Sequence, residues 1–449
     1  MSDFSYAVVS SILHDGKTID AIFSAFEPLF SELNGRRVDL ETQTAGAAPT
    51  AVPPFFFILT GGTEGIVLKY LSGVPKSSAA KPYPLVLIAH SRHNSLPAAL
   101  EIAARARQDG GSALVIQVRS AEDASARAAL LEAVALNRAI AAMRSSRIGA
   151  VGEPSDWLVA SSQKAGALKS AWGASLEPIA FQELKDTMEE LRKRDISEAL
   201  GSSALASHPA TKSPESPLGE KIFSFLRESN YKREPVGPDM YRSDIIYRAL
   251  RSIIAKRKLD ALTLRCFDLL GLEKATGCYA LSQLADDGID AGCEGDIPSI
   301  LALRWMRLLS GRPAWMANPS EITIGEKTEK GRILLAHCTV PRSLLAGYGI
   351  RSHFESGLGV AIAGVFAPGP VTLARVGGVA LDKVWIAEGQ LSRGPADEGL
   401  CRTQAYVEMD NADMARLLEK PLGNHLVVGF GHWAKIASRY LSMENLEEV

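Results

Sequence analysis

Residues 291–299 read AGCEGDIPS, and this stretch has the form of a strand-to-helix corner in an α/β protein. Its first three residues end the run LADDGIDAGC, and its last residue begins SILALRWMRLLSG, whose apolar spacing predicts a helix over 299–311. Pro298 suits the first turn of that helix, where a backbone N–H is not needed. The corner sets Glu294 and Asp296 two residues apart, and carboxylates this close repel one another. A fold keeps such a pair together if a cation neutralises it or if one member stays protonated for acid/base work.

Two local interpretations of this corner stay open on the sequence alone. If the backbone is extended, positions 294 and 296 point to the same side, since side chains alternate along a strand. Both carboxylates would then face one site. Alternatively, Asp296 caps the helix and Glu294 is solvated.

Working outward, the first third of the chain alternates apolar strand-like runs with helical patterns. PPFFFILT, PLVLIAH and SALVIQV are such runs, and a further unit opens at RIGAVGEPSDWLVAS, residues 147–161. Strands that alternate with helices predict parallel βαβ units. From about residue 312 the runs become short, β-rich and separated by Gly and Pro, as in RILLAHCTV and NHLVVGFGH, which predicts an antiparallel, barrel-like region. Residues 201–219, rich in Ser, Pro, Ala and Gly, are predicted to be an exposed loop.

Composition limits the class of protein. The chain has 449 residues, more than one hydrophobic core usually supports, so two or three domains are expected. The 49 basic and 51 acidic side chains nearly balance, so the net charge does not indicate binding to nucleic acid or to an anionic membrane. The beginning, MSDFSYAVVSSILHDG, lacks a basic leader before a long apolar run, and no segment approaches the length of a membrane span. We therefore expect a cytoplasmic protein.

The five cysteines form no CxxC pair, so we expect reduced thiols, mostly as small buried side chains. Cys266 lies two residues before Asp268, and Cys293 directly before Glu294. A zinc site that uses Cys266 or Cys293 stays open as a weaker alternative, since a thiolate ligand would favour Zn²⁺, although the spacing fits no standard zinc pattern.

Further polar residues occupy positions where ligands are commonly bound. Asp268 follows LTLRCF and is expected near the carboxyl end of a buried parallel strand, where open α/β sheets present binding groups; a loop or helix start is the alternative. His337 ends the run RILLA, and His425 lies in GNHLVVGFGH. Histidine with carboxylate suits Mn, Co, Fe or Zn ions. His93, in HSRHNS after an apolar strand, lies in a corner that could bind an anionic or hydroxylated ligand.

Taken in order, the motifs resemble the L-fucose isomerase-like family of sugar isomerases, to which L-arabinose isomerase is more distantly related. The resemblance extends from about residue 55 to about residue 440. It rests on TGGTEG, HSRHNS, GEPSDWL, LRCFD, AGCEGDIPS with LLSGRP, AHC, CRTQ and GNHLVVGFGH.

The resemblance implies two N-terminal Rossmann- or flavodoxin-like α/β domains and a C-terminal β-barrel-like domain. The expected boundaries are 1–145, 146–315 and 316–449, with the acidic site in the second domain. It further implies a homo-oligomer, trimeric or hexameric, in which the first domain of one subunit approaches the active site of its neighbour.

The resemblance also implies the site residues and the cofactor. Asp268 falls where the family has an acidic ligand and base, although Glu is frequent there, Asp296 where it has the second carboxylate, and His425 where it has the histidine ligand. These three would bind Mn²⁺ or another divalent ion such as Co²⁺ or Mg²⁺, and Asp268 and Asp296 would be catalytic. The residues expected to contact a monosaccharide are Glu294, which would also orient the site, His337, Arg402, Gln404, Asn424 and His93.

The expected reaction is the interconversion of an aldose of the L-fucose, D-arabinose or L-arabinose type with its ketose through a cis-enediol. The ion would polarise the carbonyl, and a carboxylate would move a proton between C2 and C1. A metal-dependent aldolase or epimerase, which needs the same ion and base, is one alternative. A carbohydrate-binding regulatory protein without catalysis is another.

Overall fold

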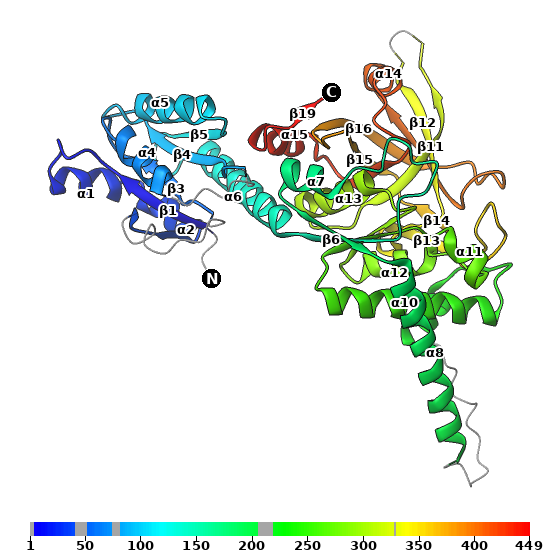
Figure 1. The fold of residues 1–449 in the computed structure, drawn as a ribbon. Coiled ribbons are helices and arrows are strands. Elements are labelled where there is room, and N and C mark those ends of the chain that lie inside the picture. Colours follow the sequence, from blue (N-terminus) through cyan, green and yellow to red (C-terminus); the bar gives the residue numbers. More distant parts are fainter. Residues whose placement is uncertain (1–3, 41–51, 74–80, 205–218, 327–328) are drawn as a thin grey trace. The chain divides into compact units, whose positions relative to one another are not determined.

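The computed structural model describes residues 4–40, 52–73, 81–204, 219–326 and 329–449 (Figure 1). The chain forms two compact units, one of residues 1–144 with 436–447 and the other of residues 145–435 with 448–449. Most of the predicted loop 201–219 lies outside the described residues, and residues 201–204 form the end of a helix. The division into three domains stays a prediction.

The first unit is built on a parallel sheet with the strand order β2-β1-β3-β4-β5. Its strands are β1 (Phe4–Val9), β2 (Gly35–Arg37), β3 (Phe55–Ile58), β4 (Leu85–His90) and β5 (Ala113–Val118). Its helices are α1 (Gly16–Ser24), α2 (Glu27–Glu32), α4 (Glu64–Gly73), α5 (Ser95–Gln108) and α6 (Ala124–Ser145), to which the C-terminal segment adds α15 (Ala434–Met443). The expected parallel α/β organisation is therefore confirmed here.

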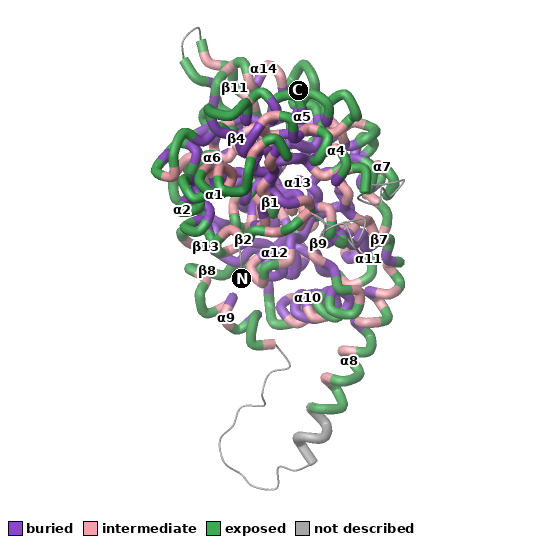
Figure 2. Tube along the Cα trace, turned by 90° about the vertical axis from the view of Figure 1, so that its left-hand side faces the viewer, coloured by how far each residue is buried: buried purple, intermediate pink, exposed green. Residues whose placement is uncertain are grey.

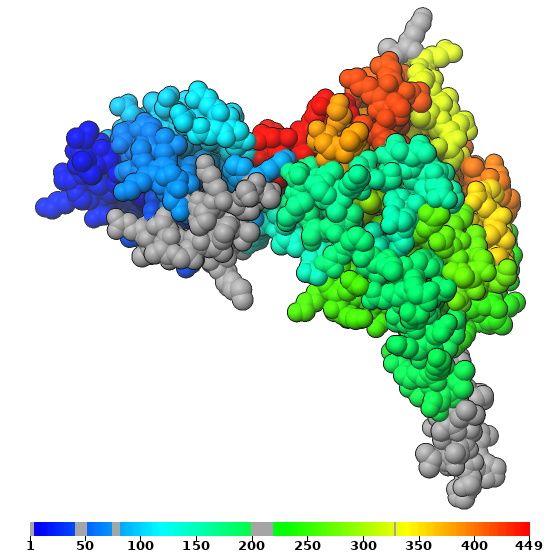
Figure 3. All heavy atoms as spheres, in the orientation of Figure 1, coloured from blue at the N-terminus to red at the C-terminus, as the bar shows by residue number. Residues whose placement is uncertain are grey.

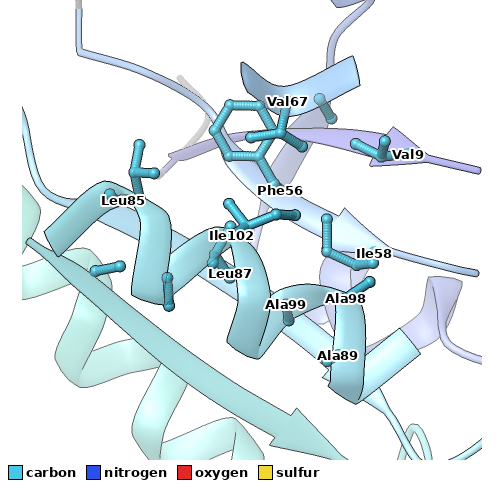
Figure 4. Close-up of a cluster of buried hydrophobic side chains, with 14 of the residues drawn as sticks. Val9, Phe56, Ile58, Val67, Leu85, Leu87, Ala89, Ala98, Ala99 and Ile102 are labelled. Carbon is cyan, nitrogen blue, oxygen red and sulfur yellow. The ribbon is translucent and has the colours of Figure 1, made fainter. Parts of the chain in front are cut away.

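The core of this unit explains why uninterrupted apolar runs form its central strands. Every residue of β3 and β4 is buried, as in parallel sheets with both faces covered. Figure 4 shows Ala98, Ala99 and Ile102 of α5 packed toward Phe56 and Leu87 of the sheet. The alanines let the helix lie close to the strands.

The second unit begins with another parallel sheet, in the strand order β10-β9-β6-β7. Its strands are β6 (Arg147–Val151), β7 (Ser175–Ile179), β9 (Ala261–Leu264) and β10 (Asp290–Cys293). Its helices are α7 (Ala165–Trp172), α8 (Phe181–Ala204), α9 (Glu220–Glu228), α10 (Gly237–Arg257), α11 (Asp268–Glu273), α12 (Cys278–Asp286) and α13 (Ile297–Ser310). Helices α12 and α13 are buried along most of their length (Figure 2).

The β-rich region of this unit is a closed antiparallel barrel. The strands run in the order β15-β18-β11-β12-β17-β16, and pairing of β15 with β16 closes the ring. They are β11 (Trp315–Thr323), β12 (Gly331–His337), β15 (Gly369–Gly377), β16 (Lys383–Arg393), β17 (Thr403–Met409) and β18 (Leu426–Phe430). A smaller sheet holds β8 (Tyr231–Lys232), β13 (Leu345–Arg351) and β14 (Ala361–Phe366), and the remaining elements are η1 (Arg342–Leu344), α14 (Asn411–Glu419) and β19 (Glu447–Glu448). The expected barrel is confirmed.

Helix α13 joins the parallel sheet to the barrel, because it packs against β9 and β10 on one side and against β15 and β18 on the other (Figure 1). The contact with β18 is close at Gly429, where an added Cβ would meet the sulfur of Met306. Figure 3 shows the green atoms of the parallel-sheet region continuous with the yellow and orange atoms of the barrel. This packing brings the AGCEGDIPS corner to the barrel strand that follows His425.

Among the described residues, no helix has both the length and the apolar character needed to cross a membrane.

Candidate metal centre

The corner between β10 and α13 is not extended. Glu294 and Gly295 both adopt left-handed backbone conformations, with φ of 64° and 72°. The segment before α7 holds the corner, because the Ser155 N–H donates to the Glu294 carbonyl at 2.9 Å. An added Cβ at Gly295 would lie 2.8 Å from Cα of Pro154. Of the two alternatives left open by the sequence, the extended corner is therefore excluded, and Asp296 caps the helix as in the other, although Glu294 is buried and not solvated. The two carboxylates approach one histidine from different sides.

Asp296 caps α13 inside the protein. Its Oδ1 accepts the Ser299 N–H at 2.8 Å, and its Oδ2 lies 3.1 Å from Nη1 of Arg375 and 2.8 Å from Nδ1 of His425. The Asp296 side chain is fully buried. Although burial raises its pKa, Arg375 and His425 hold that pKa well below the usual range. Asp296 therefore acts as an ionised anchor for His425.

Three residues converge in front of this anchor: Glu294, His337 and His425 are buried, and one potential ligand atom from each lies within 4.8 Å of the others. Nε2 of His425 lies 3.4 Å from Oε1 of Glu294. The second oxygen of Glu294 accepts the Trp157 Nε1–H at 2.7 Å. Nδ1 of His337 accepts the Thr339 N–H at 3.2 Å, so its Nε2 is the nitrogen available to a ligand.

The two imidazoles carry different charges at neutral pH. Burial and the neighbouring His425 lower the pKa of His337 to about 3, so its ring is neutral. Burial also lowers the pKa of His425, but the neighbouring Asp296 and Glu294 carboxylates outweigh it and raise that pKa to about 9. His425 is therefore protonated, and the proton on its Nε2 lies between His425 and Glu294, where a metal ion bound by the group would lie.

The donor set fits a divalent ion. One carboxylate and two imidazoles suit transition ions better than Mg²⁺, which prefers oxygen ligands and water. Nε2 of His425 is buried without a well-formed hydrogen bond, and Nδ1 is fixed by a carboxylate, as is usual for histidine ligands. Glu294, His337 and His425 could therefore hold a metal ion.

A cavity of about 500 Å³ opens beside this group. Glu294 and His337 form part of its wall together with aromatic, thiol and amide side chains. Besides these two, it is lined by Trp157, Cys266, Phe267, Leu270, Thr276, Cys278, Cys293, Asn318, Ser320, Ala336, Cys338, His353, Phe354, Glu355, Leu400, Cys401 and Asn424. Its size and mixed lining suit a small polar molecule.

The structure brings some of the sequence-predicted residues to the cavity and leaves others outside. Glu294, His337 and Asn424 line it, and His425 completes the ligand group. Asp268 does not line it, because it begins α11 and pairs through Oδ1 with Nε of Arg265 at 3.0 Å, with 39% of its side chain exposed.

Arg402 and Gln404 support a loop at the cavity edge. Arg402 donates to the Ser352 carbonyl at 3.0 Å and pairs with Glu398 at 3.0 Å. Gln404 accepts the Asp397 N–H and donates to the Asp397 and Cys401 carbonyls. Both hold the loop that carries Cys401. His93 belongs to the first compact unit, in the loop after β4, and its role stays a prediction.

Sequence reasoning missed two residues of this centre. Trp157 lies in the motif GEPSDWL, but the sequence does not show that its indole N–H donates to Glu294. Arg375 was passed over, although an arginine inside the apolar run VTLARVGG is a signal, since a buried guanidinium needs a carboxylate partner.

The fold and the centre together define a class: parallel α/β sheets and a closed barrel, with a buried Glu/His/His group that could hold a divalent ion beside a cavity. Two similar proteins are the sulfoquinovose isomerases of Priestia aryabhattai and Priestia megaterium. Each is 26% identical to the chain over 252 residues, 55% of the chain and 51% of the relative. The sulfoquinovose isomerase of Alkalicoccus urumqiensis is 30% identical over 135 residues, 29% of the chain and 30% of the relative.

The chain therefore spans about half the length of the first two relatives. No protein-family model matches the chain. The similarity to sugar isomerases covers about half of the chain.

Proposed function

We propose that the chain is a metal-dependent aldose–ketose isomerase that acts on a monosaccharide through a cis-enediol. The observation that carries the proposal is the buried group of Glu294, His337 and His425 at the cavity. The relatives that are named sulfoquinovose isomerase support the reaction class.

In this proposal Glu294, His337 and His425 hold the ion, and Asp296 positions His425. This revises the expected ligand set, in which Asp268 and Asp296 were the carboxylates. Asp296 is already engaged by Ser299, Arg375 and His425 and does not line the cavity, whereas Glu294 does. We keep Mn²⁺ as the proposed ion, with Co²⁺ as an alternative; the two imidazoles make Mg²⁺ a poorer fit.

The bound ion would supply Lewis acidity to the oxygens at C1 and C2 and stabilise the negative charge of the enediolate. The chain supplies the rest. His425 is fixed by Asp296, and Glu294 by Trp157, so the ligand group is preorganised. Amide and hydroxyl side chains of the wall, Asn318, Ser320 and Asn424, suit sugar hydroxyls.

Two carboxylates are candidates for the base that moves the proton between C2 and C1. Glu355 lines the cavity, and Asp268 is the residue expected from the sequence. Exchange of the C2 hydrogen with solvent deuterium distinguishes them. The base is the residue whose amide variant, Glu355→Gln or Asp268→Asn, still binds metal but no longer supports exchange.

A sugar panel tests the function. The purified chain is loaded with Mn²⁺ and offered pentoses, 6-deoxyhexoses, hexoses and sulfoquinovose, with products identified by NMR. The proposal expects conversion of at least one aldose to its ketose, abolished by EDTA and restored by Mn²⁺.

Other products would contradict the proposal in different ways. Shorter carbonyl compounds would indicate an aldolase, and inversion at one carbon an epimerase. A folded chain that binds sugar but neither retains metal nor converts any aldose would indicate a binding protein. A homo-oligomer of three or six subunits is part of the proposal, and sedimentation velocity measures it.

A further inference from the structure

All five cysteines of the chain line the same cavity, although they are spread between residues 266 and 401. They are Cys266, Cys278, Cys293, Cys338 and Cys401, and all are free thiols. Buried cysteines usually act as small apolar side chains, and such a role does not require them to share one cavity. Their convergence therefore calls for a chemical explanation.

Two of these thiols are in direct contact. The sulfur atoms of Cys266 and Cys293 lie 2.9 Å apart. Cys293 ends β10 and is paired in register with Leu264, the last residue of the neighbouring strand β9, and Cys266 follows two residues later. The parallel ladder thus holds Cys293 beside the end of β9, and Cys266 lies in the turn just beyond that end. A disulfide holds its sulfurs about 2.05 Å apart, so closing this pair requires a movement of less than about 1 Å.

The geometry points to a modification site: we propose that Cys266 and Cys293 close to an intramolecular disulfide when hydrogen peroxide enters the cavity. One sulfur attacks a peroxide oxygen, which breaks the O–O bond, forms a sulfenic acid and releases one water with the thiol proton. The second sulfur then attacks the sulfenic sulfur, forms the S–S bond and displaces hydroxide, which leaves as water with the second thiol proton. Two thiols lose two electrons, and peroxide gains them.

The modification would reach the proposed metal ligands directly. Cys293 immediately precedes Glu294, whose left-handed backbone leaves little freedom to absorb a shift of its neighbour. Drawing the Cys293 sulfur toward Cys266 is expected to displace the Glu294 carboxylate from His425. This consequence rests on the proposed function, whereas formation of the disulfide does not.

Peptide mapping of the full chain tests the site. The protein is reduced, freed of reductant, treated with peroxide for hours, alkylated in denaturant and digested without reduction. The treatment is long because the reaction is expected to be slow. Contact with Cys266 and burial raise the pKa of the Cys293 thiol, which slows its attack. The expected result is a cross-linked Cys266–Cys293 peptide, a mass lower by two hydrogens and two fewer alkylated thiols, all reversed by dithiothreitol.

Matched variants locate the reaction. Cys266→Ser is expected to abolish the cross-link, whereas Cys278→Ser, which changes a thiol in the same cavity outside the contacting pair, is expected to retain it. If a variant fails to fold, the peptide map of the wild-type chain is sufficient to decide the proposal. The proposal is overturned by no reaction, by a cross-link between other cysteines, or by accumulation of sulfinic acid at Cys266 or Cys293 in place of the disulfide.

Metal content separates this inference from the proposed function. The oxidised chain is expected to bind Mn²⁺ at least tenfold more weakly than the reduced chain. If neither form binds metal but the cross-link forms, the proposed metal site fails and the modification site stands. If the reduced chain binds metal and no cross-link forms, the modification site fails and the proposed metal site stands.

Discussion

His425 is held by Asp296 at Nδ1, and Oε1 of Glu294 lies 3.4 Å from its other ring nitrogen, Nε2. The two acids of the AGCEGDIPS corner are therefore close together because they lie on either side of one histidine. The sequence indicated that both acids and His425 belong to one site, but it assigned Asp296 to the ion and Glu294 to orienting the site, whereas in the structure Glu294 lines the cavity and Asp296 does not. That depends on the left-handed conformation of Glu294, which period-two alternation cannot anticipate.

The first prediction at the residue scale concerns pH. A metal ion must displace the proton from His425, whose pKa of about 9 in the metal-free chain keeps it charged at neutral pH. Protons therefore compete more strongly as pH falls, and Mn²⁺ affinity should rise about tenfold per unit from pH 7 to 9 and level off above that. His337, with a pKa of about 3, adds no dependence in this range. Titration calorimetry in two buffers measures the affinity and the released proton; an affinity independent of pH would contradict this assignment.

The second prediction concerns the anchor. Asp296→Asn should weaken Mn²⁺ binding by about 10- to 100-fold, because the amide no longer holds His425 in the ligand orientation. Asp290→Asn is the matched control, since Asp290 is also buried and pairs with Arg307 and Arg304, away from His425. Both variants should lower the free energy of unfolding, but only Asp296→Asn should change metal affinity. An equal effect of the two variants on affinity would show that Asp296 has no positioning role.

At the scale of elements, the strand and helix runs were predictable because they are long and apolar. The strands β3 and β4 and the helix α13 fall where hydrophobic periodicity placed them. Short turns and short helices were harder to predict from the sequence. Asp268 starts helix α11 four residues after β9 ends, which is the helix start that the sequence left open as the alternative to a position near the strand end. Which residues face the cavity depends on such turns, and hydrophobic periodicity says little about them.

The corner between β10 and α13 gives a prediction at this scale. Gly295→Ala should destabilise the protein by about 1–2 kcal/mol for the left-handed conformation alone, with a further cost from the contact with Pro154. The displaced corner should also weaken Mn²⁺ binding. Gly311→Ala at the other end of α13 is the control, because Gly311 has φ of 69° but no atom near an added Cβ. It should lower the free energy of unfolding by a similar backbone term and leave metal binding unchanged; weakened binding in both variants would contradict the account of the corner.

At the scale of the whole molecule, the chain ends in the unit in which it begins. Residues 436–447 belong to the first unit, where Glu444 of the C-terminal segment pairs with Arg144 at 2.7 Å and both side chains are almost fully buried. The predicted third domain, residues 316–449, includes this segment, and that division stays a prediction. Nothing in its local pattern shows which unit it joins, since that depends on a distant arginine.

This pairing predicts a local effect. Glu444→Ala should destabilise the first unit by about 3–5 kcal/mol, because it leaves the Arg144 guanidinium buried without its partner. Glu132→Ala removes the partner of Arg439, which lies on α15. This pair is more exposed than the pair of Arg144 and Glu444, so the loss should cost about 1 kcal/mol or less. Hydrogen exchange of β4 and β5 measures the loss, and metal affinity should stay unchanged because the ligand group lies in the second unit. Faster exchange in the barrel instead would show that the segment supports the other unit.

The central claim is that Glu294, His337 and His425 form the metal site, and Mn²⁺ affinity of paired variants tests it most directly. Glu294→Gln and His337→Ala remove proposed ligands, whereas Asp268→Asn changes the carboxylate expected from the sequence that lies outside the cavity lining. Metal content by mass spectrometry and dissociation constants by calorimetry are measured on variants with unchanged circular dichroism. The account predicts at least about a 100-fold loss of affinity in the first two and little change in the third. Loss of metal in Asp268→Asn with full binding in Glu294→Gln would contradict it.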